Sequence, residues 1–370
     1  MTRQSRRYTH LFIALILAET WSPIAHASAA VLISSQGNVW ITPQGSQERV
    51  PQVGENIEAG TRIRTGKDGA ADLRFTNGSL LRLRPATSMR LSATPRIKEK
   101  KTSILLFFGR LWSKVARSES IHYEVNTPNA VAGVRGTEFE TAVADDGSLR
   151  VRVQESSVAV GSDNKEAVAE AGTHVDGDER GLKTPQTAAE NPQWNSWEAS
   201  GQQRLRKTSR TIVDGMRDRI MQRKQKLEKL RGEQRDIERK VSEAHRRAQT
   251  GDTAAITEIR QYNQKLAEIA DAIADIADQT ESQFEIVDHF ADLAGDPRLG
   301  ISRKYIVSQA KSLRRVRSDL DKLVKEGTDI SVDAMEKMLQ DINQGKTKTL
   351  KDRKGSSADD LFGDDDMDFR

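Results

Sequence analysis

The chain lacks cysteine and has few aromatic residues. Its 370 residues include no Cys and 5% aromatics, against 30% charged residues. The absence of cysteine excludes a disulfide framework, a Cys-ligated zinc, an Fe–S cluster and a lipid-modified N-terminal cysteine. Much charge with few aromatics is typical of long solvated helices with narrow apolar seams, rather than of one large globular core. The length allows two or three domains.

Residues 1–27 have the layout of a secretory signal peptide. A basic start, a short apolar run and a small-x-small site follow one another (Arg3, Arg6 and Arg7; residues 11–18; Ala25 to Ala27). A membrane-spanning helix needs about 20 apolar residues, and Glu19 interrupts this run. We therefore expect cleavage between Ala27 and Ser28, rather than an uncleaved anchor. The mature chain is then periplasmic or otherwise secreted and has no integral membrane span.

Cleavage also lowers the net charge. It removes three Arg and one Glu, which leaves 55 Lys and Arg against 53 Asp and Glu, a net charge of about +2. This small excess gives little reason to expect a nucleic-acid partner. The charges are segregated instead, since residues 62–117 hold fourteen Lys or Arg and three acids. Two interpretations stay open: the solvated face of half-buried strands, or contact with an anionic envelope polymer or lipid headgroups.

Residues 30–175 have a strand-like pattern. Short apolar alternations are separated by glycine-containing turns at intervals of roughly eight to twelve residues. This spacing predicts an all-β domain, either sandwich-like, barrel-like or solenoid-like.

One hairpin can be predicted with its register. A two-residue loop would set Val143 opposite Arg150 and mix apolar with charged residues on one face. A three-residue loop at 145–147 instead pairs Val143 with Leu149, and in the same register Phe139 with Val153. Since a one-residue slip inverts every side chain, burial selects the three-residue loop. Gly147 then takes the left-handed position in it.

The same parity argument applies to residues 72–84. The alternation there requires a loop with an odd number of residues around Asn77, Gly78 and Ser79. We place Gly78 outside the third position of that loop.

Several short pieces of this segment resemble, in the right order, the FecR domain. They are Val53-Gly54 leading to Ile57 and Gly60; Ile63 to Gly66 with Asp68 to Ala70; Asn77 to Ser79 with Leu81, Leu83 and Pro85; Gly109 to Trp112; and Val125 to Pro128 running into Val131 to Phe139. The resemblance implies an all-β extracytoplasmic module without known enzymatic activity, used in envelope signalling or fused to other envelope modules. We assign it to residues 28–175.

One departure from FecR-type sigma regulators matters for function. Those regulators place a cytoplasmic helical segment and a membrane span before this domain, whereas here only the signal peptide precedes it. Direct contact with a cytoplasmic sigma factor is therefore not expected.

The most distinctive piece of the resemblance is a short signature loop. Its residues are Gly133, Val134, Arg135, Gly136, Thr137 and Phe139. Glycine permits positive φ or close backbone approach, and arginine offers five donors in a rigid fork. We favour a tight crossover before the strand at 137–143, with Arg135 bonded to carbonyls or a nearby acid, over a loop that faces a ligand or partner. We likewise favour a core role for the apolar group Leu105 to Phe108, Leu111 and Trp112.

Beyond the β-rich segment the pattern becomes helical. Residues 176–196 read as a linker, and we expect Trp194 and Trp197 at its end to dock helices onto the β-domain, in preference to forming a carbohydrate platform. Helices are expected at 197–249, 252–294, 302–327 and 331–343, and Asp252 or Thr253 can cap the second of them.

Opposite charges on successive helices favour an antiparallel bundle or coiled coil over 197–345. A basic helix lying on anionic lipid is the competing interpretation. Self-association through the helices stays open, and residues 346–370 read as a disordered tail.

No catalytic or metal-binding pattern is present in the sequence. The four histidines left after cleavage are not at metal-ligand spacing (His122, His174, His245 and His289). There is no nucleophile elbow and no phosphate-binding loop. We therefore expect a non-enzymatic protein without cofactor or metal, which binds an envelope protein or an anionic envelope polymer as a binding or scaffold module. The alternative is a signalling component that relays to a membrane-spanning regulator.

Overall fold

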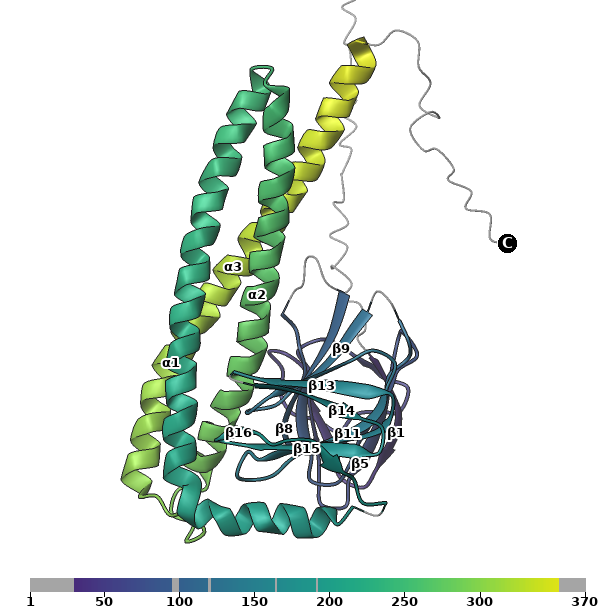
Figure 1. Ribbon diagram of the computed structural model, residues 1–370, viewed down its shortest axis with the longest axis vertical. Helices are drawn as coiled ribbons and strands as arrows, with labels where there is room; N and C mark the ends of the chain where they lie inside the picture. The colour runs from purple at the N-terminus through teal and green to yellow at the C-terminus, as the bar shows by residue number, and fades with distance from the viewer. Residues whose placement is uncertain (1–29, 95–99, 119–120, 164, 191, 353–370) are drawn as a thin grey trace, which may run out of the picture.

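The computed structural model contains a β-domain followed by three long helices (Figure 1). It describes residues 30–94, 100–118, 121–163, 165–190 and 192–352, and of 329–352 only the backbone. The expected signal peptide with its cleavage site at Ala27 and Ser28 lies outside the described residues, as does most of the expected tail. The combination of an all-β domain with an all-α region is confirmed.

The strands form two sheets that share one long strand, β8 (Lys100–Lys114). Sheet A contains β1 (Ala30–Gln36), β3 (Asn56–Ile57), β5 (Ala70–Phe75), β6 (Leu80–Leu83), β11 (Glu138–Val143), β12 (Leu149–Glu155), β15 (Thr173–Asp178), β16 (Gly181–Leu182) and β17 (Gln186–Thr187). Sheet B contains β2 (Val39–Thr42), β4 (Arg62–Thr65), β7 (Ser88–Leu91), β9 (Ile121–Asn126), β10 (Val131–Val134), β13 (Ser157–Ser162) and β14 (Lys165–Glu170).

Strand β8 passes from one sheet to the other at Gly109. Its first half pairs with β7 and β9 in sheet B, and its second half pairs with β6 and β11 in sheet A. Gly109 has φ +90°, and a Cβ there would lie 2.4 Å from the Cα of Thr87. Only glycine fits this crossing, since other residues would clash with the neighbouring backbone.

The two sheets enclose one apolar core. Inward-facing residues of both sheets are almost without solvent exposure, among them Leu32, Leu73 and Phe139 from sheet A and Leu106 and Val160 from sheet B. The pairs are antiparallel except β8 with β9. The domain is therefore the sandwich-like form of the expected all-β fold.

The predicted hairpin is confirmed in register. β11 and β12 pair Phe139 with Val153 and Val143 with Leu149, and Gly147 has φ +75°. The hairpin of β5 and β6 also has an odd loop, since Leu73 lies opposite Leu81. Our placement of its glycine was wrong: the amide of Phe75 donates to the carbonyl of Ser79, so the loop is 76–78 and Gly78 is its third residue.

Residues 176–196 are more structured than a linker. They include the end of β15 and the short strands β16 and β17, and helix α1 begins at Trp194. Strand pairing continues because Arg150 on β12 holds Asp176 on β15 at 2.7 Å. The alternation that marks strands was lost from the sequence here, since β16 and β17 are only two residues long.

The helices are α1 (Trp194–Gln249), α2 (Thr253–Asp292) and α3 (Arg303–Asp352). Asp252 caps α2 by accepting from the amides of Ala254 and Ala255, as expected. The expected stop at Gly327 was wrong, because α3 continues through it to Asp352. A Cβ at Gly327 would lie 2.8 Å from Cδ1 of Ile273, so this glycine permits close helix packing rather than ending a helix.

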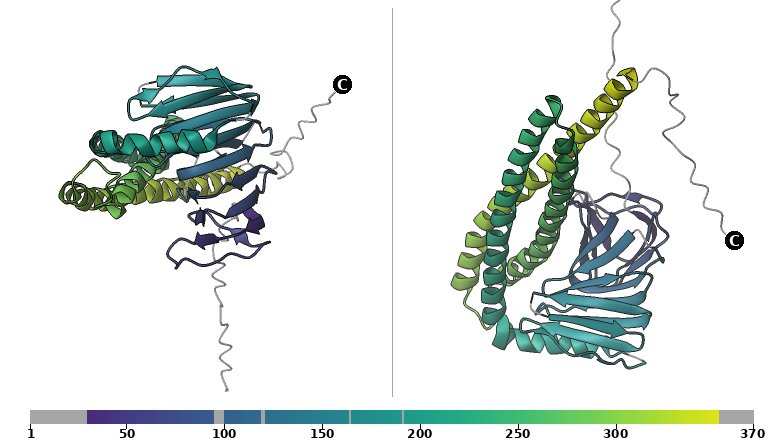
Figure 2. Two further views of the ribbon diagram at one scale, coloured as in Figure 1. Left: turned by 90° about the horizontal axis from the view of Figure 1, so that it is seen from below. Right: turned by 45° about the horizontal axis from the view of Figure 1, so that its top comes forward.

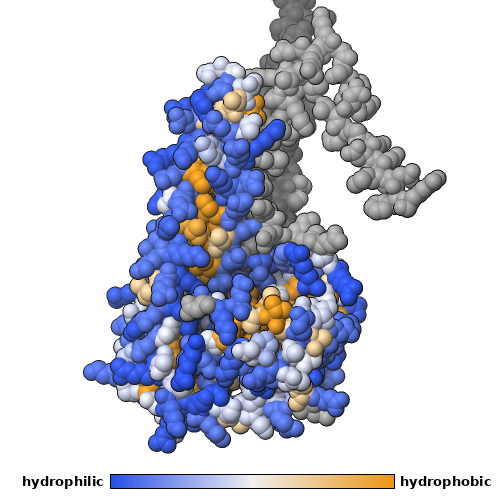
Figure 3. Space-filling view, in the orientation of Figure 1, coloured by the Kyte–Doolittle hydropathy of each residue, from blue (hydrophilic) through white to orange (hydrophobic). Residues whose placement is uncertain are grey.

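The helices lie along one side of the β-domain (Figure 2). The first turns of α1 run beneath the strands, and the α1–α2 hairpin then projects past the β-domain. A strip of hydrophobic residues follows this hairpin on the face shown in Figure 3. Within the described residues, no helix is long and apolar enough to span a membrane.

Candidate functional site

Helix α2 lies on the outer face of sheet B. Beneath it, Leu105 and Phe107 of β8 are 2% and 0% exposed, although they point away from the sandwich core. Phe108 packs against the helices, and its ring centroid is 4.3 Å from that of His289. Strand β8 is thus buried on both faces. Leu105, Leu106, Phe107 and Leu111 therefore have the core role that we favoured over a contact patch, whereas Trp112 is only half-buried, on the outer face of sheet A.

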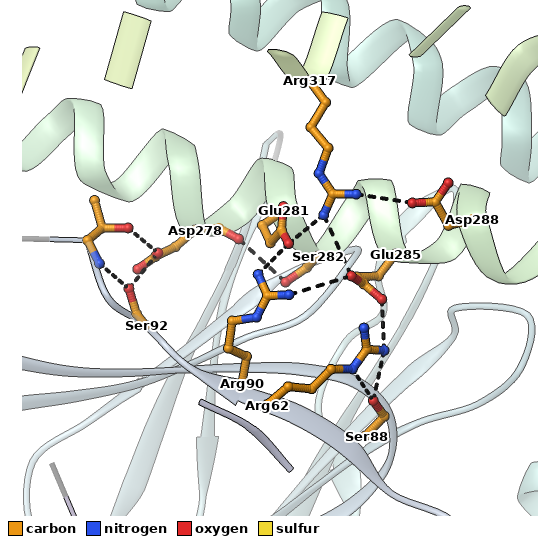
Figure 4. A network of polar contacts seen from close by, with 11 residues as sticks. Arg62, Ser88, Arg90, Ser92, Asp278, Glu281, Ser282, Glu285, Asp288 and Arg317 are labelled. Carbon is orange, nitrogen blue, oxygen red and sulfur yellow. Dashed lines mark hydrogen bonds and ion pairs between the residues drawn. The ribbon is translucent and has the colours of Figure 1, made fainter. Parts of the chain in front are cut away.

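Ion pairs join this face to α2 and α3 (Figure 4). Arg62 on β4 contacts Glu285 at 2.9 Å, and Arg90 on β7 contacts Glu281 at 2.5 Å. Arg317 on α3 contacts Glu281 from the other side, also at 2.5 Å. Two carboxylates one turn apart on α2 therefore connect two strands with a second helix. We call this network, together with Asp278, the junction.

Asp278 is the most buried acid of the junction, with 3% exposure. Its carboxylate accepts hydrogen bonds from the hydroxyls of Ser92 at 2.7 Å, Thr94 at 3.0 Å and Ser103 at 2.8 Å. Ser103 in turn accepts from Nδ2 of Asn126. Hydrogen bonds to an ionised group are roughly twice as strong as neutral ones. This carboxylate therefore anchors α2 to the end of β7 and to β8.

Burial and ion pairing shift the pKa values of the charged groups at and beside the junction in opposite directions. Burial lowers the pKa of Lys101, but the carboxylates of Glu124 and Asp275 outweigh it and leave that pKa raised. Burial likewise lowers the pKa of Arg317, and its acidic partners on α2 raise it above its ordinary value. For Asp288 burial wins, and its pKa is raised despite Arg317. The cations are thus firmly charged where they meet α2.

A second contact holds α1 against sheet A. The guanidinium of Arg110 lies 4.9 Å from the ring of Trp194, and that of Arg150 lies 5.4 Å from the ring of Trp197. The two indoles meet edge to face. The expected docking of the helices through these two tryptophans is confirmed.

The charge pattern of the helices serves the expected purpose and one more. We expected the acidic second helix to pair with the basic helices on either side, and Arg317 of α3 contacts Asp288 while Arg247 of α1 contacts Glu258. In addition, Glu281 and Glu285 of α2 are shared between Arg317 of α3 and the β-domain. On α1, Arg223 reaches Asp163 of the β-domain. The physical reason is packing: the acidic face of α2 lies against sheet B.

A cleft of about 1100 Å³ opens beside the junction. Its β-side is lined by Arg62, Arg64 and Arg90, and its helical side by Glu281 and Asp321. Burial, with Glu281 nearby, raises the pKa of Asp321. Arginines on one side of the cleft therefore face carboxylates on the other side. Such a lining can hydrogen-bond to a polar segment of another molecule.

The signature loop lies away from the junction. Gly133 and Val134 end β10, and Thr137 precedes β11, whose Phe139 is buried in the core. Arg135 is exposed, and its Nη2 lies 2.6 Å from Nε2 of His122, rather than from a carbonyl or acid.

The two glycines of the loop differ in whether a side chain would fit in their place. Gly136 has φ +68°, and a Cβ there would clash with Arg117. At Gly133 the nearest atom to such a Cβ is 3.9 Å away, so this position has room for a side chain.

In the ranges described above, no three His, Asp or Glu side chains come together as metal ligands. His289 on α2 is half-buried and its pKa is lowered, first of all by desolvation, and the pKa of His174 on β15 is lowered for the same first cause.

The residues of the junction were not singled out by sequence reasoning. A usable signal existed, because Asp271, Asp278, Glu285 and Asp292 recur every seven residues and so share one face of α2.

The fold and the junction define a two-part protein, in which a β-sandwich carries a docked helical hairpin. Residues 61–159 match the sequence profile of the family described as FecR protein. The match runs from the residue before β4 into β13, so the central part of the β-domain is similar to the FecR family.

Two crystal structures of a candidate anti-sigma factor from Parabacteroides distasonis ATCC 8503, at 1.65 and 2.50 Å resolution, are similar to this chain. In each case the identity is 18% and the TM-score 0.31, and the likeness covers 37% of this chain. The aligned part covers 63% of the length of each of those two structures. No curated protein matches this chain.

Proposed function

We propose that this protein is a non-enzymatic binding or scaffold component of the cell envelope that holds a protein partner on its projecting helices. It acts in the periplasm after loss of residues 1–27. The observation that carries the proposal is the junction, which fixes the helices to the β-domain by buried charges. A hairpin held at its base keeps a set orientation, as a scaffold requires.

The projecting part of the hairpin supplies a contact surface. We call residues 230–269 the helical arm; they span the turn between α1 and α2. Ile256 near its tip is 44% exposed, and Leu230 and Ile269 are partly buried against the helical core. Figure 3 shows a strip of hydrophobic residues along this hairpin. An exposed apolar strip with a polar border is typical of a protein contact site.

Crosslinking in cells tests this proposal. A photoreactive amino acid is placed at Ile256 on the arm and at Arg135 in the signature loop. Val307, which is 46% exposed near the start of α3, is the matched control. We expect crosslinks to an envelope protein from position 256 that are absent from position 307. Equal yields from 256 and 307, or none, would remove the support for the arm as a contact surface.

A second candidate function is a relay to a membrane-spanning regulator. The FecR match favours it, since that family acts in signalling. Recovery of a single inner-membrane regulator in the same crosslinking would displace the scaffold proposal, whereas peptidoglycan-associated or outer-membrane partners would support it. N-terminal sequencing of the protein from the envelope fraction should give Ser28.

A further inference from the structure

Five side chains form a row across the outer face of sheet A. In register, Arg82 lies opposite Trp112, Trp112 opposite Glu140, Glu140 opposite Arg152, and Arg152 opposite His174. Directly opposed side chains on neighbouring strands lie close enough to interact. The centre of the row is Glu140, which is 6% exposed.

Three arginines surround Glu140 without satisfying it. Nη2 of Arg84 is 4.0 Å from one carboxylate oxygen, and Nη1 of Arg152 is 3.8 Å from the other. Both separations exceed hydrogen-bond length. The third arginine, Arg110, lies beside them on β8. The Nε atoms of all three are buried and have no hydrogen-bond partner in the part of the chain that the structure describes. Buried donors without acceptors are rare in folded proteins, because each one is costly.

Positive charge is in excess in this cluster. Three guanidinium groups face the carboxylate of Glu140, with Glu198 of α1 as a second acid near Arg110. Burial lowers the pKa of Arg110, and the charge of Arg84 lowers it further. The two acids thus leave one cation uncompensated.

The start of α1 adds to this excess. Its first residue, Trp194, packs on Arg110, so the helix begins beside the cluster. No side chain caps this N-terminus, and its first turn carries no acid. The free amides at a helix N-terminus favour a negative group nearby.

We propose that Arg84, Arg110 and Arg152 form a binding site for a carboxylate or phosphate group. The planar fork of arginine suits both groups. Arg84 keeps 37% of its side chain exposed, so the cluster opens to solvent there. The bound group accepts from N–H groups of the three guanidiniums, among them the Nε atoms without a partner, while Nη2 of Arg152 keeps its bonds to the carbonyls of Ala189 and Glu190. The site uses sheet A, whereas the junction uses sheet B, so it goes beyond the proposed function and does not depend on it.

Thermal-shift titration of the full mature chain tests the site. Inorganic phosphate and acetate are each compared with chloride at equal ionic strength, so the two arms distinguish phosphate from carboxylate. The variants are Arg84→Gln and Arg152→Gln. Arg74→Gln is the matched control, since Arg74 is an exposed arginine on β5 of the same sheet. Because phosphate stabilises proteins generally, only the part of the shift that the control retains and the two variants lose counts as binding.

Glu140→Gln makes the test directional. Glu140 lies about 4 Å from the guanidinium groups of Arg84 and Arg152, so removing its negative charge should tighten binding of an anion to them. The interaction of two unit charges about 4 Å apart in water sets the scale of this gain at about fivefold. A structural role for Glu140 alone predicts no such gain. We expect tighter binding in Glu140→Gln and at least about tenfold weaker binding in Arg84→Gln. Equal shifts in wild type, Arg84→Gln and Arg74→Gln for both ions would overturn the proposal. If Glu140→Gln does not fold, the comparison of Arg84→Gln with Arg74→Gln alone tests the site.

Discussion

Replacement of Asp278 by asparagine tests the junction at its most buried acid. Three hydroxyls donate to this carboxylate, two to Oδ1 and one to Oδ2. Asparagine keeps one acceptor oxygen, so one hydroxyl loses its acceptor and the other two bond a neutral oxygen. A hydrogen bond to a charged group contributes about 1.5–3 kcal/mol, and a neutral one about half of that. We therefore expect Asp278→Asn to cost about 2–4 kcal/mol of docking free energy.

Amide hydrogen exchange, read by mass spectrometry, measures this loss where it occurs. Peptides from residues 273–292 of α2 and 100–108 of β8 should exchange faster in Asp278→Asn, since local opening exposes them. Asp292→Asn is the matched control on the same helix, because Asp292 is exposed and exposed charges contribute little to stability. If both variants accelerate exchange equally, or neither does, Asp278 is not the anchor of α2.

The remaining predictions concern pH and backbone geometry. Because burial lowers the pKa of His289 below its ordinary 6.5, the unfolded chain takes up its proton first, and stability falls as the pH drops below 6.5. The charges of Asp145 and Asp292 raise the pKa of His289 and so oppose this lowering, whereas Arg298 adds to it. The thermal midpoint of His289→Phe should therefore depend less on pH between about 5 and 6.5 than that of wild type or of the control His245→Gln. Gly147→Ala should cost about 1–2 kcal/mol in urea unfolding, because φ is +75° there, whereas Gly161→Ala on β13 should cost little; equal losses would argue against the hairpin geometry. Gly327→Val should cost about 1–3 kcal/mol through overpacking against α2, and an unchanged midpoint would mean that the helices are less closely packed there.

The local parts of the fold were predictable because one rule decided each of them. The register of β11 and β12 follows from burying Phe139 and Val143 on one face, and a single loop length satisfies that demand. Asp252 caps α2 because a short acceptor side chain stands directly before the helical pattern. Trp194 and Trp197 needed a buried partner, and the strands supplied arginines for stacking.

The junction could not be predicted in the same way. Glu281 meets Arg90 across 191 positions of sequence, and no local pattern specifies such a pair. The acidic face of α2 was compatible with any basic surface, and both the neighbouring helices and residues 62–117 offered one. Packing decided, since Leu105 and Phe107 needed a cover that only α2 provides. Gly327 misled for a similar reason, because glycine marks helix ends and close contacts alike.

The double burial of β8 has a consequence for biosynthesis. Ribosomes deliver β8 well before α2, so the outward side of Leu105 and Phe107 stays bare until at least residue 292 has been made. An apolar strand face exposed in this way is prone to aggregate with other chains. Premature termination between the domains should therefore give insoluble product, and the helices act as a built-in cover for the strand that joins the two sheets.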